Sequence, residues 1–163
     1  MTVLSRPHHR TRPTWLSPPH RSIIAQSSRY LGALAVLATG IAHFEQYSVD
    51  NYSTVPTIGT LFLLNFIAGV VIALGLVAPL RRVAGRYTDA VHAAFAIVGI
   101  GLGVVSLAAL FISESSGLFG FVEHGYRMAI VVSIVAEAAA SVFLVTFLVA
   151  NGTGLQKIRG SSR

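Results

Sequence analysis

Two pairs of histidine and glutamate residues are candidates for metal chemistry. His43 and Glu45 lie at the end of one apolar run, and Glu123 and His124 stand just before another. Imidazole and carboxylate together form a ligand set that suits zinc, copper or iron. The spacing matches no known metal signature, and two residues at i and i+2 project in different directions on a helix. The simpler interpretation is therefore that these are interfacial polar groups held by hydrogen bonds.

Glu137 is the most informative ionisable residue, because it lies deep within an apolar segment. An ionised, unpaired carboxylate at the centre of a membrane costs ~3 kcal/mol on insertion scales. We therefore expect Glu137 to be protonated or hydrogen-bonded, with Asn65 of another segment as its partner. Two roles stay open. The carboxyl carries protons or contacts a substrate, or it donates a hydrogen bond across the helices and fixes their packing.

His92 is the third polar residue predicted to lie within a span. It stands three residues after Asp89, so the two side chains can pair at i,i+3 on a helix at the membrane surface. Haem ligation would need a second histidine at matched depth, and none stands on that side within an apolar segment. A structural role is therefore favoured for His92.

The elements that must position these residues follow from composition. Of the 163 residues, 53% are hydrophobic and 11% are charged, whereas soluble domains carry roughly 25% charged residues. Four apolar segments, 28–47, 57–80, 89–112 and 126–150, are long enough to cross a bilayer, which needs ~20 residues as a helix. Helix is the only open-ended backbone form that lipid tolerates. We predict an all-α fold, an integral membrane four-helix bundle over residues 28–150.

The flanking segments have a different composition from the apolar core. Residues 1–27 are rich in Arg, His, Pro and Ser and are predicted to form a disordered basic arm, and residues 151–163 a short basic tail. A signal peptide cleaved after Ala42 is a competing interpretation of the N-terminal segment.

The basic residues predict the orientation of the chain. The formal charge is +6, and all the Lys and Arg residues except Arg127 lie before or at the start of the first apolar segment, between the second and third, or after the fourth. Because Lys and Arg are retained on the cytoplasmic side, both termini are predicted to be cytoplasmic in a multi-pass protein of the cell inner (plasma) membrane. The charge is then a topology signal, and no nucleic acid is expected as a partner.

Small residues are predicted to line the contacts between helices. Gly99 and Gly103 have the GxxxG spacing, and Ser133, Ala136 and Ala140 share one face of the last segment. Small residues let helix backbones approach closely in lipid. These faces serve internal packing or bind a partner helix, and the polar groups beside them are expected to face the interior.

Several kinds of chemistry have no support in the sequence. The chain has no cysteine, which excludes disulfides and thiolate metal sites. It also lacks a Gly-rich phosphate loop, a nucleophile elbow and the H-E-x-x-H motif. We therefore expect a protein that is not an enzyme.

Residues 40–80 carry a pattern, GIAHF followed by Pro56 and a glycine-spaced apolar segment, that resembles small four-span bacterial membrane proteins of the DoxX-like type. The pattern is also similar to small membrane proteins common in actinobacteria. The resemblance implies a four-span bundle that serves a larger membrane complex. The acidic residue often present in the second helix of DoxX-like proteins is absent near Val70, so no catalytic residue is carried over.

Three functions are compatible with these features. The leading prediction is a non-enzymatic accessory or assembly subunit of a larger membrane complex, or a homo-oligomer, with the lipid bilayer, a membrane protein or a second copy as partner. The alternative is a small proton-coupled transporter or channel component that uses Glu137 and Asn65. A third is a metal- or redox-handling subunit with the His/Glu site at the outer face. The sequence points to no particular cofactor.

Overall fold

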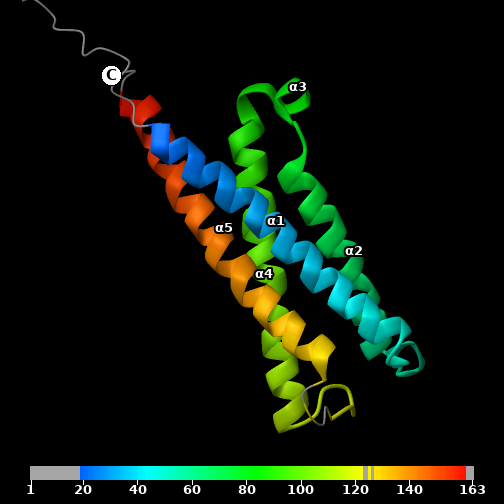
Figure 1. Ribbon diagram of the computed structural model, residues 1–163. Helices are drawn as coiled ribbons and strands as arrows, with labels where there is room; N and C mark the ends of the chain where they lie inside the picture. The colour runs from blue at the N-terminus through cyan, green and yellow to red at the C-terminus, as the bar shows by residue number, and fades with distance from the viewer. Residues whose placement is uncertain (1–18, 123–124, 126, 161–163) are drawn as a thin grey trace, which may run out of the picture.

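The chain folds into an all-helical structure (Figure 1). The computed structural model describes residues 19–122, 125 and 127–160, with side chains described between 23 and 152 of these. The four long helices are α1 (Pro19–Ser48), α2 (Ile58–Val77), α4 (Thr88–Ser115) and α5 (Met128–Gly160). The short elements are η2 (Tyr52–Thr54), α3 (Arg81–Ala84) and η3 (Gly85–Tyr87).

Three helical stretches of the described chain are long and apolar enough to cross a membrane. They are Ile58–Val77, Arg81–Ser115 and Met128–Gly152. Helix α1 has 30 residues but is not among them, because Arg29, Glu45 and other polar residues interrupt its apolar sequence. An all-helical membrane protein is confirmed to this extent, and a fourth span stays a prediction.

Two helices extend beyond their predicted ends. Helix α1 begins at Pro19 rather than near residue 28, and α5 continues through Asn151 and Gly152 to Gly160. Proline is tolerated in the first turn of a helix. A glycine inside a helix costs only about 1 kcal/mol relative to alanine, which does not end a helix whose next turn keeps its hydrogen bonds. Residues 1–18 of the predicted arm and 161–163 of the tail lie outside the described residues.

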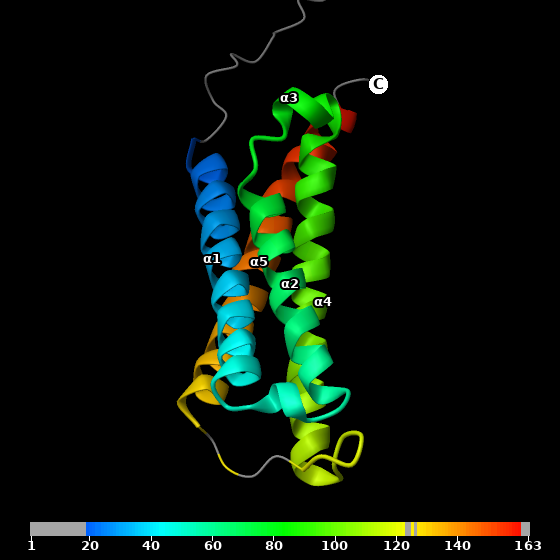
Figure 2. The ribbon, with the colours of Figure 1, turned by 90° about the vertical axis from the view of Figure 1, so that its right-hand side faces the viewer.

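The four long helices pack side by side, with α1 against both α5 and α2, and α4 against both α5 and α2. The contact between α1 and α5 is the most extensive, and that between α2 and α4 is the smallest of these four. The first turn of α1, the last turn of α5 and α3 lie together at what we call the terminal end (Figure 2). The α1–α2 and α4–α5 connections lie at the opposite, or loop, end.

An apolar core occupies the half of the bundle nearer the terminal end. Its buried side chains come from all four long helices: Ala33, Ala35, Val36, Ile72, Leu76, Ala96, Ala140, Leu144 and Phe147. Many large apolar side chains point outward instead, including Leu34, Leu74, Val98 and Val135. Outward apolar faces of this kind are compatible with contact to lipid.

Helices α1 and α2 approach closely through their backbones at Gly40 and Gly69. A Cβ atom placed on Gly69 would lie 3.2 Å from the Cα of Gly40 and 3.2 Å from the carbonyl oxygen of Val36. Both atoms belong to backbone and cannot move aside without shifting a helix. Gly69 therefore sets the distance between α1 and α2.

We predict that Gly69→Val lowers the free energy of unfolding by roughly 1 to 3 kcal/mol, the usual cost of overpacking a tight contact. Unfolding in detergent micelles, followed by circular dichroism, measures the change. Gly101→Val is the matched control, because a Cβ at Gly101 of α4 meets no atom within 4 Å. Equal destabilisation by the two substitutions would contradict the prediction.

Candidate functional site

A cavity of ≈ 320 Å³ lies among the four long helices in the half of the bundle nearer the loop end. Most of its lining is apolar, and Leu118 and Phe121 of the α4–α5 connection contribute to it. Seven polar side chains also line it: His43, Gln46, Asn65, Ser106, Ser113, Ser133 and Glu137. Apolar cavities with a few convergent polar groups are the usual form of a small-molecule site. We call this space the polar cavity.

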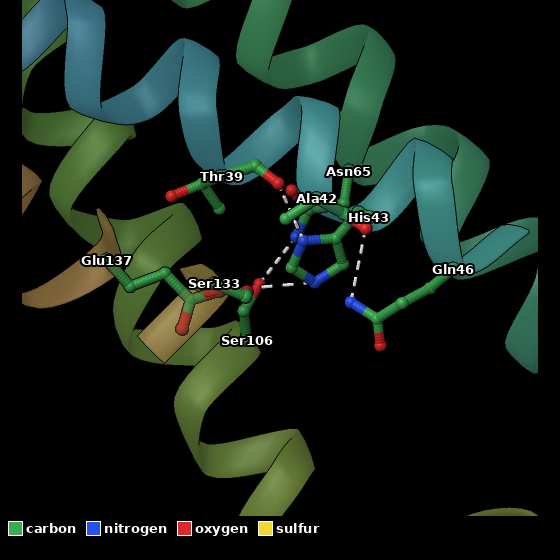
Figure 3. A network of polar contacts seen from close by, with 8 residues as sticks. All are labelled: Thr39, Ala42, His43, Gln46, Asn65, Ser106, Ser133 and Glu137. Carbon is green, nitrogen blue, oxygen red and sulfur yellow. Dashed lines mark hydrogen bonds and ion pairs between the residues drawn. The ribbon is translucent and has the colours of Figure 1, made fainter. Parts of the chain in front are cut away.

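His43 of α1 faces Glu137 of α5 across the polar cavity (Figure 3). Its Nδ1 lies 2.9 Å from the carbonyl oxygen of Thr39, one turn earlier in α1. A carbonyl only accepts, so Nδ1 carries the hydrogen, and in the neutral ring Nε2 is the nitrogen with the free lone pair. That Nε2 lies 4.0 Å from Oε1 of Glu137. The two ionisable groups are therefore neighbours in the cavity wall, at a separation longer than a direct hydrogen bond.

Helix α5 holds the Glu137 carboxyl from its own preceding turn. Ser133 donates a hydrogen bond of 3.0 Å to Oε1 of Glu137, and Glu137 is only 2% exposed. Gly103 of α4 packs against the backbone and Cβ of Glu137, and Gly99 packs against Leu144. The small residues of α4 therefore bring its backbone close to α5 beside the carboxyl.

Asn65 of α2 lines the same cavity with a different partner from the one expected. Its Nδ2 donates to the hydroxyl of Ser106 on α4 at 2.5 Å, and no hydrogen bond joins it to Glu137 among the described side chains. Its Oδ1 is buried and has no hydrogen-bond partner among the described residues, and Asn65 as a whole is 8% exposed. An unsatisfied buried carbonyl oxygen costs free energy unless a further donor reaches it.

The other residues of the small-residue faces are also inside the bundle. Ala136 and Ala140 are buried on α5 with Ser133. Ser141 donates to the carbonyl oxygen of Glu137 at 2.9 Å. The faces therefore serve packing within the chain, and within the described residues they leave no small-residue stripe on the outer surface of α5.

His92 lies nearer the terminal end and is buried there. Nη1 of Arg29 lies 2.8 Å from Nδ1 and 2.9 Å from Nε2 of His92, and that Nε2 lies 3.3 Å from the carbonyl oxygen of Ala78. The ring accepts a hydrogen bond from Arg29, and among the described residues no hydrogen bond or ion pair joins it to Asp89. This contact ties α1, the end of α2 and the start of α4 together, which is a structural role.

The predicted His/Glu rim is only partly within the described structure. His43 is buried while Glu45 is exposed, and Glu123 and His124 lie outside the described residues. Among the residues that are described, no group of three His, Cys, Asp or Glu side chains comes together. The metal site therefore stays a prediction. The partner of His43 that the sequence did not reveal is Glu137, although serine or threonine at i−4 from each was a usable signal.

Aromatic side chains close the loop end of the polar cavity. The ring of Tyr52 in η2 meets Phe62 edge-on at 5.0 Å between centroids and Phe121 at 5.3 Å. Arg127, just before α5, donates to the hydroxyl of Tyr52 and lies 3.3 Å from a carboxylate oxygen of Asp50. These contacts hold η2 against the start of α5 at the loop end of the polar cavity.

Comparison with protein-family models, with curated proteins and with solved structures finds no match for this chain. The DoxX-like resemblance therefore stays a prediction, and the polar cavity is the feature of the molecule that bears on function.

We predict that dicyclohexylcarbodiimide, an apolar reagent for protonated carboxyl groups, modifies Glu137 in membranes. Glu137 lines the polar cavity, whose walls are mostly apolar and would disfavour the ionised carboxylate. Peptide mass spectrometry would locate the adduct. Glu137→Gln should lose the adduct, and Glu45→Gln, at an exposed position on α1, should retain it. An unmodified Glu137 beside modified exposed carboxyl groups would count against this site.

Proposed function

We propose that the chain is a four-span integral membrane protein of the plasma membrane with both termini in the cytoplasm. The three apolar helices support membrane insertion, and the packing of α1 against α2 and α5 supports its crossing beside them. Burial inside the bundle hides the polar residues that lower the hydropathy of α1. Basic side chains at the terminal end support the orientation: Arg29, Arg81, Arg82 and Arg86.

We further propose that the protein acts as a small proton-coupled transporter or channel component. The observation that carries this proposal is the buried His43–Glu137 pair on the wall of the polar cavity. Ionisable residues within membrane bundles commonly mark proton relays and substrate paths, because their burial is costly. Here the pair faces a space large enough for a small ligand rather than a sealed contact between helices.

The arrangement couples a proton to the contents of the cavity. With the proton on Glu137, both groups are uncharged and the site is neutral. With the proton on Nε2, the site holds an imidazolium and a carboxylate. A ligand that hydrogen-bonds to either group changes the relative free energy of the two forms, which links ligand binding to movement of the proton.

An accessory subunit would need fewer of the features that this structure has. An assembly subunit needs helix packing and an outer contact face, and neither requires a buried His43–Glu137 pair or an unpartnered oxygen on Asn65. The outward apolar faces are compatible with a protein partner or with lipid alone. The polar cavity therefore favours the transporter over the assembly subunit.

We predict that the loop end is outside the cell and the terminal end inside. Because the chain has no cysteine, a single introduced cysteine labels uniquely. A membrane-impermeant maleimide added to intact cells should label Ser53→Cys, at an exposed position of η2, and should label Ser162→Cys only after the cells are opened. Labelling of Ser162→Cys in intact cells would invert or remove the proposed topology.

We predict that Glu137→Gln reduces proton movement through the protein at least tenfold, because glutamine accepts the Ser133 hydrogen bond but cannot carry a proton. Purified protein in vesicles with an interior pH-sensitive dye gives the rate after valinomycin and a potassium gradient set a membrane potential.

Glu45→Gln is the matched control and should keep the wild-type rate, since Glu45 is exposed on the same helix as His43. The proposal fails if wild-type vesicles acidify no faster than vesicles without protein, or if the Glu137→Gln rate equals the wild-type rate.

A further inference from the structure

We infer that the polar cavity is entered sideways from the membrane, between α2 and α4, by a small molecule with an apolar body and a hydroxyl head. The inference rests on the proposed function and names the class of its substrate. It is carried by the shape of the cavity mouth, by the apolar space that continues from it, and by the unpartnered oxygen of Asn65.

The mouth lies on the outward side of the α2–α4 contact. Three residues that line the polar cavity are also largely exposed: Leu61 at 41%, Leu64 at 54% and Val105 at 67%. A side chain can both line a cavity and face outward only where the cavity opens. These residues come from α2 and α4, the neighbouring pair with the least extensive contact in the ring.

A second cavity of ≈ 360 Å³ continues along the same pair of helices toward the terminal end. Its lining comes from α2 and α4 alone and is entirely apolar, and Ala68 lines both cavities. Val71 and Val98 of this second cavity are exposed on the outward face. An apolar chain can therefore lie between the helices while its head group occupies the polar cavity.

Within the described residues, side chains pack across both ends of the bundle. The rings of Tyr52, Phe62 and Phe121 cover the loop end. Toward the terminal end the buried core, including Ile72 and Leu76, fills the bundle. A ligand that enters between apolar helix faces comes from hydrocarbon, so it is dissolved in the bilayer rather than in water.

The polar wall selects the head group. Oδ1 of Asn65 is a buried acceptor that lacks a donor. Ser106 already accepts from Asn65 Nδ2, so its own hydroxyl hydrogen can be donated to a ligand. A hydroxyl group matches both: it donates to the Asn65 oxygen once the amide turns that buried atom toward the cavity, and it accepts from Ser106. A purely apolar molecule would leave the Asn65 oxygen unsatisfied.

Photolabelling with a diazirine-bearing octanol in vesicles tests the inference. Adducts located by peptide mass spectrometry should concentrate on the parts of α2 and α4 that line the polar cavity. Excess octanol should compete with the label, and octane should not. Asn65→Ala should reduce the labelling roughly five- to tenfold, the usual effect of losing one buried hydrogen bond.

A matched pair of substitutions tests the mouth. Val105→Trp should block labelling by filling the opening, whereas Val104→Trp should label like the wild type, because Val104 is 55% exposed on the same helix but does not line the cavity. Leu64→Trp, with Leu74→Trp as its control, repeats the comparison from α2 if Val105→Trp does not fold.

Even labelling over all outward faces, equal competition by octanol and octane, or full labelling of a folded mouth-blocked variant would overturn the inference. Photolabelling measures occupancy and needs no proton movement. If the label fails while Glu137-dependent proton movement persists, only the substrate class is wrong. If the label binds as described and proton movement is absent, the transport proposal is wrong and the binding site stands.

Discussion

The burial of polar side chains among apolar helices is the constraint on which this structure depends. Helix α1 brings Arg29, Thr39, His43 and Gln46 into a bundle whose other long helices are predominantly apolar. A buried polar group without a partner costs free energy comparable to a lost hydrogen bond, and among the described residues Arg29 Nε, Thr39 Oγ1 and Asn65 Oδ1 are left without one. His43 finds the Thr39 carbonyl and Glu137, and Arg29 finds His92. The position of α1 against both α5 and α2 follows from these needs and from Gly40.

Tight and loose contacts are unequally distributed around the ring of helices. Small residues bring α1 close to α2 at Gly40 and Gly69, and bring α4 close to α5 at Gly103. The α2–α4 contact is the least extensive of the four, and larger apolar side chains such as Leu64 and Val105 line the cavity there. Close packing on the other sides therefore leaves the residual space, and its opening, between α2 and α4.

The candidate site was predictable in its members and unpredictable in its partnerships. Glu137, Asn65 and His43 are conspicuous in the sequence because ionisable and amide groups are rare in apolar segments. Depth along each helix suggested that Asn65 would pair with Glu137. In the structure Asn65 donates to Ser106 instead, and the Glu137 carboxyl accepts from Ser133 and lies 4.0 Å from His43. Depth alone does not determine the rotation of a helix about its axis, and that rotation decides which side chains meet.

By itself the sequence determined the helical class, the apolar segments and the faces on which small residues let backbones approach, because hydropathy and helical periodicity are local properties of the chain. In the structure the first turn of α1 and the last turn of α5 lie at the same end of the bundle. Only the tertiary structure decided that His43 would face Glu137, that Asn65 Oδ1 would be left without a donor, and that the cavity would open between α2 and α4. These features depend on the axial shift and rotation of four helices packed against one another, which are settled by contacts between residues far apart in the chain.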